Sequence, residues 1–177
     1  MLTVKDKNFV PFIEKQALEE RIAEVGREIS EDYRDKNPLF VVVLNGSFMF
    51  AAELMKNVSI ACEITFVRVS SYSKTESTGE LTEILGLKQS IHQRHVIIVE
   101  DIVDTGNTIE ELKAILKEHN VKHFKIATLF LKPEAYKKDI KLDYVGIRIP
   151  NKFIVGYGLD YDGLGRNLKD VYQLSEN

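Results

Sequence analysis

A run of acidic and hydroxyl side chains follows a strongly apolar segment in the middle of the chain. Apolar residues over 96–99 lead into Glu100 and Asp101, and a turn over 104–108 carries an aspartate, two threonines and a glycine. A continuous, mostly β-branched apolar run predicts a strand that is covered on both faces, as in a parallel sheet. The turn precedes an amphipathic stretch over 109–119, so it should lie at a helix amino terminus, where free amides favour phosphate. The run therefore points to chemistry on a phosphorylated sugar.

Two simpler interpretations of this run compete with a sugar phosphate site. A P-loop requires a lysine and a glycine spacing that the turn lacks, so a nucleoside triphosphate cradle is disfavoured. Alternatively, Asp104 would only cap the following helix and Gly106 would only make the turn. Two adjacent carboxylates at the end of a buried strand weaken this second interpretation, because burying a charge is costly.

The elements that would position these residues alternate between strands and helices. Helices are expected over 14–33, 48–56 and 109–119, and strands over 39–44, 60–69, 81–87, 96–101, 124–131, 142–149 and 153–157. This order predicts an α/β fold with a mainly parallel twisted sheet flanked by helices, and residues 1–177 are expected to form one domain. Asn45, Gly46 and Lys132 join the 101–108 segment at the carboxyl ends of strands, where such sheets bind ligands.

Composition and charge narrow the possible partners. The formal net charge of −3, without a cluster of lysine or arginine, argues against nucleic-acid binding. No apolar segment is long enough to span a bilayer and no secretory signal is evident, so no membrane association is expected. Cys62 is the only cysteine, which favours a reducing compartment, and a cytoplasmic location is expected.

The segment 96–108 resembles the phosphoribosyl pyrophosphate-binding motif of the type I phosphoribosyltransferases: an apolar strand, Glu-Asp, two apolar residues, Asp-Thr-Gly, one variable residue and Thr. Further segments resemble the hypoxanthine-guanine phosphoribosyltransferases, namely Val-Leu-Asn-Gly-Ser-Phe over 43–48, the polar stretch 70–80, Leu-Phe-Leu-Lys-Pro over 129–133 and the segment 149–161. The resemblance implies the type I phosphoribosyltransferase fold, with a small hood formed by the N- and C-terminal segments.

The resemblance also implies a reaction and a set of site residues. Ribose 5-phosphate would pass from phosphoribosyl pyrophosphate to N9 of hypoxanthine or guanine, with Asp104 as the general base, giving IMP or GMP and pyrophosphate. The donor would be bound by Glu100, Asp101, Thr105, Gly106, Asn107, Thr108, Asn45, Gly46, Ser71, Tyr72 and Arg166, the purine by Lys132, Phe153, Ile154 and Asp160, and Mg²⁺ by Glu100, Asp101 and Asp160. From the residues alone, Lys132 could equally be a surface charge, Phe153 a core residue and the 70–80 stretch an ordinary surface loop.

One position departs from the family pattern. The family usually carries a lysine or arginine before the glycine of the pyrophosphate loop, whereas this chain has Asn45 before Gly46. The resemblance implies a cis peptide bond between Leu44 and Asn45, whose loop amides could still bind pyrophosphate. Loss of the positive charge predicts weaker pyrophosphate binding, or compensation elsewhere.

Two further functions stay open within the resemblance. Some relatives are regulators that keep the fold as a sensor of phosphoribosyl pyrophosphate and bind nucleic acid. An enzyme that prefers a different base is the other possibility. The combination of Lys132, Phe153 and Asp160 favours the 6-oxopurine enzyme. Homodimers or homotetramers are usual in the family and are expected here.

Overall fold

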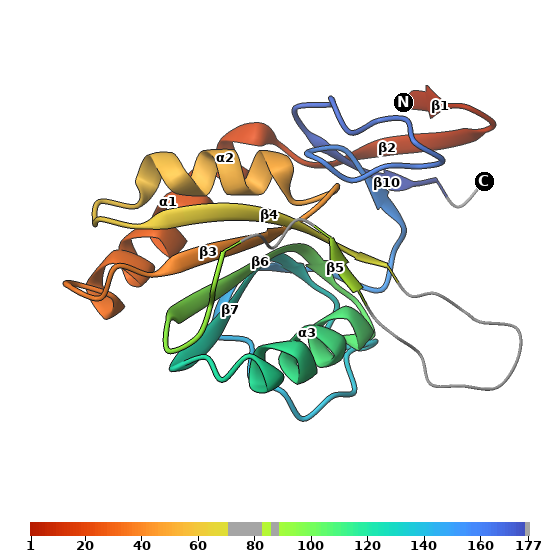
Figure 1. Cartoon of the computed structure of the whole chain (residues 1–177). Coiled ribbons are helices and arrows are strands. Elements are labelled where there is room, and N and C mark those ends of the chain that lie inside the picture. The colour runs from red at the N-terminus through yellow and green to blue at the C-terminus, as the bar shows by residue number, and fades with distance from the viewer. Residues whose placement is uncertain (71–82, 86–88, 176–177) are drawn as a thin grey trace, which may run out of the picture.

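The structure is a computed structural model that describes residues 1–70, 83–85 and 89–175, and it contains two sheets and three helices in that part of the chain (Figure 1). In chain order the elements are β1 (Leu2–Val4), β2 (Lys7–Ile13), α1 (Lys15–Asp32), β3 (Leu39–Val43), α2 (Phe48–Asn57), β4 (Glu63–Ser70), β5 (Glu83–Leu85), β6 (His95–Val103), α3 (Asn107–Glu118), β7 (His123–Leu131), β8 (Tyr144–Arg148), β9 (Ile154–Val155) and β10 (Val171–Leu174).

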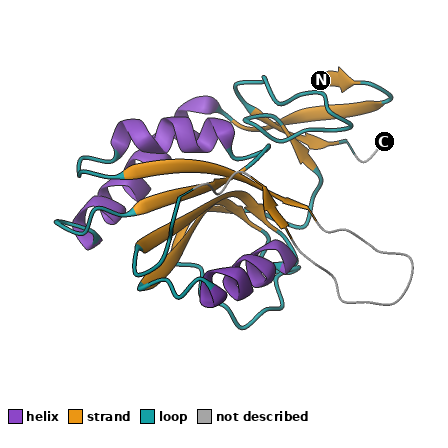
Figure 2. Cartoon of the chain, viewed as in Figure 1, coloured by secondary structure: helices purple, strands orange, loops and turns teal. Residues whose placement is uncertain are grey.

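The larger sheet has six strands in the order β5-β4-β3-β6-β7-β8. Strands β4, β3, β6, β7 and β8 are parallel, and only the edge strand β5 is antiparallel. Helices α1 and α2 cover one face and α3 covers the other (Figure 2). The predicted α/β fold with a mainly parallel sheet flanked by helices is therefore confirmed.

Alternate side chains of the central strands enter two different cores. On β3, Phe40 and Val42 pack in the cluster that includes Leu18 and Ile22 of α1. Val41 and its neighbours on the other face pack in the cluster formed with α3. Each fully buried aliphatic or aromatic side chain stabilises the fold by about 1.5–3 kcal/mol, so apolar residues on both faces hold these strands at the centre of the sheet.

The smaller sheet is the hood, and it joins the two ends of the described chain. Its strands are antiparallel in the order β1-β2-β10-β9, and Figure 1 shows it beside one end of the larger sheet. The expectation of a hood from the N- and C-terminal segments is confirmed. The strand expected over 153–157 is β9, which belongs to the hood. It is shorter than expected because Gly156 and Tyr157 both have positive φ angles and end it at Val155.

Two element boundaries near the expected site differ from the prediction. Strand β6 continues to Val103, because Ile102 and Val103 pair with Phe130 and Leu131 of β7. Glu100 and Asp101 therefore lie within the strand rather than after it. Helix α3 begins at Asn107, two positions earlier than expected. The expected loop over 70–80 falls almost entirely outside the described residues, and no helix in the described part of the chain has the length and apolar character needed to cross a membrane.

Candidate active site

A cleft of about 460 Å³ opens at the carboxyl ends of β3 and β6. It is lined by Val43, Leu44, Asn45, Gly46, Val69, Glu100, Asp101, Asn107, Thr108, Glu111, Asp160 and Arg166. Eight of the residues expected from the sequence to bind ligands thus come together: Asn45, Gly46, Glu100, Asp101, Asn107, Thr108, Asp160 and Arg166. They belong to segments that are far apart in the chain, and the strand order of the parallel sheet brings them to one edge.

The turn after β6 places the amino terminus of α3, with Asn107 and Thr108, at this cleft. Gly106 is the N-cap residue of α3, its φ angle is 86°, and no side chain caps the helix. An added Cβ on Gly106 would lie 2.5 Å from the ring of Tyr136, so the position requires glycine for its conformation and for its packing. Because the first amides of a helix have no partner within the helix, the turn suits an anion. Asp104 is not the N-cap, so the interpretation of Asp104 as only a capping residue is wrong.

Glu100 and Asp101 are carboxylates whose surroundings disfavour ionisation. Glu100 is only 5% exposed and its Oε1 atom has no hydrogen-bond partner among the described residues. Burial, followed by the neighbouring Asp101 charge, raises the pKa of Glu100 well above its usual range. Burial also raises the pKa of Asp101, although the amide of Ile102 donates to its Oδ1 over 2.8 Å and Arg166 favours the charged form. Glu100 Oε1 therefore lacks a donor that a ligand could supply, whereas Asp101 already accepts one hydrogen bond at Oδ1.

The loop 44–47 closely approaches the Asp101 side chain and the C-terminal segment. An added Cβ on Gly46 would lie 1.5 Å from Asp101 Oδ2, and one on Gly158 would lie 2.0 Å from the carbonyl oxygen of Gly46. The peptide bond between Leu44 and Asn45 is cis, as the resemblance implies. These contacts join the loop after β3, the end of β6 and the C-terminal segment at a single point.

The C-terminal segment contributes an ion pair to the cleft. Arg166 Nη2 lies 2.6 Å from Asp160 Oδ1, and Arg166 Nη1 donates to the carbonyl of Gly158 over 2.8 Å. The other oxygen of Asp160, Oδ2, accepts the amide of Gly163 over 2.7 Å. Both side chains are consequently fixed in orientation before any ligand binds.

A second ion pair lies beyond the ends of β6 and β7. Lys132 Nζ donates to Asp104 Oδ2 over 2.8 Å, and the Lys132 side chain is only 10% exposed. Lys132 is held where β7 ends, because its amide donates to the carbonyl of Val103 over 3.0 Å. The structure thus brings together a carboxylate and an ammonium group that the resemblance to the family places at the purine.

The remaining expected residues lie apart from the cleft lining. Phe153 and Ile154 belong to the hood, where the Phe153 ring lies 5.9 Å from that of Tyr161 and 6.3 Å from that of Phe9. Phe153 is 45% exposed, so it is not the core residue that its apolar character could suggest, whereas Ile154 is buried. Thr105 is exposed on the turn before α3. Ser71 and Tyr72 lie outside the described residues.

One charged residue that lines the cleft and one that contacts its lining were missed from the sequence. Glu111 lines it because it follows Asn107 and Thr108 at helical spacing, so the periodicity of α3 could have indicated it. Arg68 was missed because it lies on β4, away from Asn45 in the sequence. In the structure its Nη2 donates to Asn45 Oδ1 over 2.7 Å. Only the pairing of β3 with β4 reveals this contact.

The carboxylates of the cleft can supply part of the ligand set of a magnesium ion. No group of three acidic, histidine or cysteine side chains within the described ranges could hold a metal ion by itself. Magnesium is usually held by one or two carboxylates together with water and substrate phosphates, so such a group is not required. The partnerless Oε1 of Glu100 and the carboxylate of Asp101 are oxygen ligands of the appropriate type.

Comparison with known proteins agrees with this fold. Residues 13–162 match the family model described as a phosphoribosyl transferase domain. Hypoxanthine-guanine phosphoribosyltransferases from Streptococcus pyogenes and Streptococcus mutans are 47% and 46% identical to this chain, over 86% and 87% of its length and 85% and 86% of theirs.

Solved structures give the same result. A hypoxanthine phosphoribosyltransferase from Staphylococcus aureus has a TM-score of 0.86 and 38% identity, with 94% of this chain and 91% of that chain covered. A hypoxanthine-guanine phosphoribosyltransferase from Bacillus anthracis has a TM-score of 0.84 and 35% identity, with 96% and 98% covered. The fold is that of the type I phosphoribosyltransferases. The chain belongs to this family and, within it, to the hypoxanthine-guanine phosphoribosyltransferases.

Replacement of Glu100 by glutamine tests the electrostatic cost of the buried acid. The pKa of Glu100 is higher in the folded than in the unfolded protein. The wild-type protein therefore loses stability as the pH rises from the pKa of the unfolded state to that of the folded state. Glu100→Gln removes this loss. Its free energy of unfolding relative to wild type should therefore increase from pH 5 to pH 8, by about 1.4 kcal/mol for each unit by which the pKa is raised.

The measurement is urea unfolding across this pH range, without substrates or metal. Glu118→Gln, which makes the same change at an exposed position of α3, is the matched control. A difference between Glu100→Gln and wild type that does not vary with pH would contradict the electrostatic account.

Proposed function

We propose that this protein is a purine salvage enzyme. It transfers the 5-phosphoribosyl group from phosphoribosyl pyrophosphate to N9 of hypoxanthine or guanine, with IMP or GMP and pyrophosphate as products. The proposal is supported by family membership and by the cleft at the carboxyl ends of β3 and β6.

The ion pair of Lys132 with Asp104 is the observation that carries the choice of substrate. The two groups lie 2.8 Å apart and present a donor beside an acceptor. The 6-oxo group and the N7–H group of hypoxanthine or guanine are neighbours on the purine and offer the complementary acceptor and donor. Adenine would instead direct an amino donor at Lys132, and a site built on such a polar match can discriminate by about 10⁴ or more.

The donor substrate fits the acidic and amide-lined parts of the cleft. In the proposed complex, Glu100 and Asp101 accept hydrogen bonds from the ribose hydroxyls. Glu100 Oε1 has no donor among the described residues, and Asp101 accepts one amide, that of Ile102, at Oδ1. The free amides of the 105–108 turn, together with the hydroxyls of Thr105 and Thr108, bind the 5′-phosphate. Arg166 and the loop at Asn45 and Gly46 contact the pyrophosphate.

The base and the water-excluding parts of the site are assigned by resemblance. Phe153 stacks on the purine, and its 45% exposure leaves a ring face available for this. Backbone carbonyls near Ile154 and Asp160 accept the 2-amino group of guanine. Ser71 and Tyr72 belong to the segment that excludes water from the reaction centre.

Mg²⁺ is the proposed cofactor, with Glu100, Asp101 and Asp160 as the nearby carboxylates. When bound, it would neutralise charge on the departing pyrophosphate. Asp104 would take the N7 proton of the purine as N9 attacks the ribose, and Lys132 Nζ holds its Oδ2 atom at 2.8 Å.

A direct assay tests the function and its alternatives together. Purified protein is mixed with phosphoribosyl pyrophosphate, magnesium and hypoxanthine, guanine, xanthine or adenine, and the nucleotide formed is measured by chromatography. IMP and GMP should form rapidly, the xanthine product more slowly, and AMP at least about 10⁴-fold less efficiently. Omission of magnesium should abolish turnover.

The other outcomes of this assay identify the rival functions. Binding of phosphoribosyl pyrophosphate without any nucleotide product would favour a regulatory sensor. Main product formation from xanthine or adenine would favour an enzyme with a different base preference.

Asp104→Asn tests the proposed general base. The variant should keep its fold, because Asp104 neither caps α3 nor is buried in a core. Its kcat should fall by about 10²–10⁴-fold, while the KM for phosphoribosyl pyrophosphate changes little. Asp35→Asn, an exposed position after α1, is the control. Near-normal turnover of Asp104→Asn would remove Asp104 from the mechanism.

We also propose that the protein acts in the cytoplasm as a homodimer or homotetramer. The single cysteine supports the compartment. Phe48 at the start of α2 and Ile64 and Phe66 on β4 support assembly, because they are 42%, 40% and 45% exposed and lie on the side of the sheet that α2 covers. A second copy of the chain would bury these apolar side chains.

Phe66→Asp tests this assembly. A charge in the middle of the apolar contact should shift the protein to a smaller species in analytical ultracentrifugation and should leave the thermal unfolding of the monomer nearly unchanged. Leu164→Asp, which makes the same change at an exposed apolar residue in the C-terminal segment, is the comparison. An unchanged sedimentation coefficient for Phe66→Asp would exclude this face as the contact.

A further inference from the structure

The charge of the candidate cleft is poorly matched to its proposed ligand. Glu100, Asp101, Glu111 and Asp160 are all acidic, whereas Arg166 is the only basic residue among the described residues that line the cleft. Arg166 is already paired with Asp160 at 2.6 Å. A pyrophosphate group carries several negative charges, so it requires additional positive charge near the loop that binds it.

Arg68 is a positively charged residue held against that loop. Its Nη2 atom donates to Asn45 Oδ1 over 2.7 Å, and Asn45 lines the cleft. The contact is built into the sheet: β3 and β4 are paired through Val43 and Val67, and the amide of Leu44 donates to the carbonyl of Val67 over 2.8 Å. Position 68 therefore lies beside the loop that begins at residue 44.

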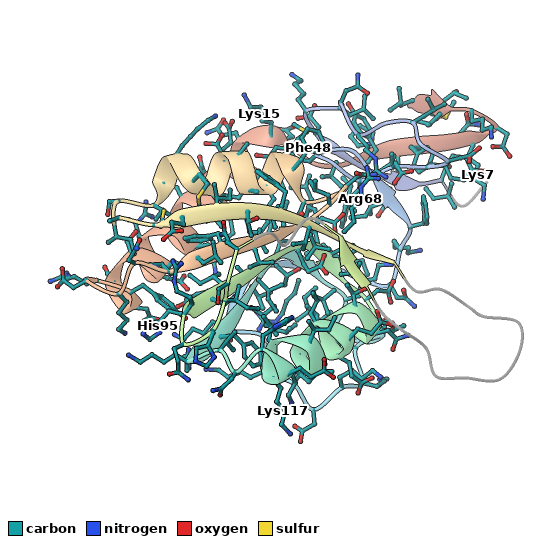
Figure 3. The ribbon with its side chains drawn as sticks, in the orientation of Figure 1. Lys7, Lys15, Phe48, Arg68, His95 and Lys117 are labelled. Atoms are coloured by element: carbon teal, nitrogen blue, oxygen red, sulfur yellow. The ribbon has the colours of Figure 1, made fainter. Side chains whose placement is uncertain are left out.

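The guanidinium group of Arg68 is available for a ligand. Its side chain is exposed, and no carboxylate pairs with it in the part of the chain that the structure describes. Figure 3 shows it close to the junction of the larger sheet and the hood, on the side of Phe48, whereas His95 lies at the opposite end of the sheet. The bond to the neutral Asn45 fixes the position of Arg68 without neutralising its charge.

We propose that Arg68 supplies the positive charge that the pyrophosphate loop lacks. Its hydrogen bond to Asn45 holds the guanidinium group of this β4 residue beside the loop. The loop has the uncharged Asn45 before Gly46, and the positively charged side chain comes from the adjacent strand β4. Arg68 is in this view a binding and positioning residue, not a catalytic one. The inference rests on the proposed transferase function, because that function supplies the pyrophosphate.

Titration of the purified protein with inorganic pyrophosphate and magnesium tests the role of the charge. Arg68→Gln keeps a donor for Asn45 but removes the charge, and it should weaken pyrophosphate binding about 10-fold. Arg68→Lys keeps the charge and should bind within about 3-fold of wild type. In the enzyme assay, Arg68→Gln should raise the KM for phosphoribosyl pyrophosphate and leave the KM for hypoxanthine unchanged.

A charge-relocation variant makes the test specific. Asn45→Lys introduced into Arg68→Gln returns a positive charge to the loop and should restore most of the lost pyrophosphate affinity. The same Asn45→Lys change in the otherwise unmodified protein should improve binding less, because Arg68 already provides the charge. Arg27→Gln, at an exposed position of α1, is the control for loss of an arginine.

Three results would overturn the proposal: unchanged pyrophosphate affinity in Arg68→Gln, equal losses in the glutamine and lysine variants, or no recovery in the double variant. Failure of the proposed function is recognised separately. In that case the unmodified protein forms no nucleotide from any base, whereas the pyrophosphate titration still compares the Arg68 variants directly.

Discussion

The candidate site depends on a close approach of main chain that only glycine allows. Gly46 lies directly against the Asp101 carboxylate, and Gly158 lies directly against the carbonyl of Gly46. A methyl group at either glycine would overlap with its neighbour. These two contacts connect the loop after β3, the end of β6 and the C-terminal segment, so they fix the hood relative to the larger sheet at the point where the cleft opens.

This close approach has an electrostatic consequence for the two acids of β6. Because β6 continues past Glu100 and Asp101 to Val103, both side chains are enclosed by the sheet and by the loop at Gly46. Burial raises the pKa of each carboxyl group. The cost in stability is offset only when a ligand supplies donors or positive charge, so the site is arranged for binding at the expense of the unliganded fold.

Local features of the sequence predicted the turn and the helices, whereas long-range pairing decided the rest. The segment 100–108 is continuous, and its acids and glycine could be recognised from their order alone. Of the hood strands only β9 was predicted; β1, β2 and β10 were not, because β2 and β10 pair over more than 150 positions of sequence. The contact of Arg68 with Asn45 could not be found for the same reason, since it follows from the pairing of β3 with β4.

The two ion pairs at the site show how an unliganded cleft can be selective in the proposed reaction. Lys132 pairs with Asp104, and Arg166 pairs with Asp160, so each charge has a partner before substrate arrives. A ligand that separates an ion pair must provide a new partner for each of its two charged groups, because a largely buried charge without a partner is costly. A base with an acceptor beside a donor can satisfy Lys132 and Asp104 together. A base with two donors at that edge can satisfy only Asp104, and the ammonium group of Lys132, which is nearly buried, would remain unpaired.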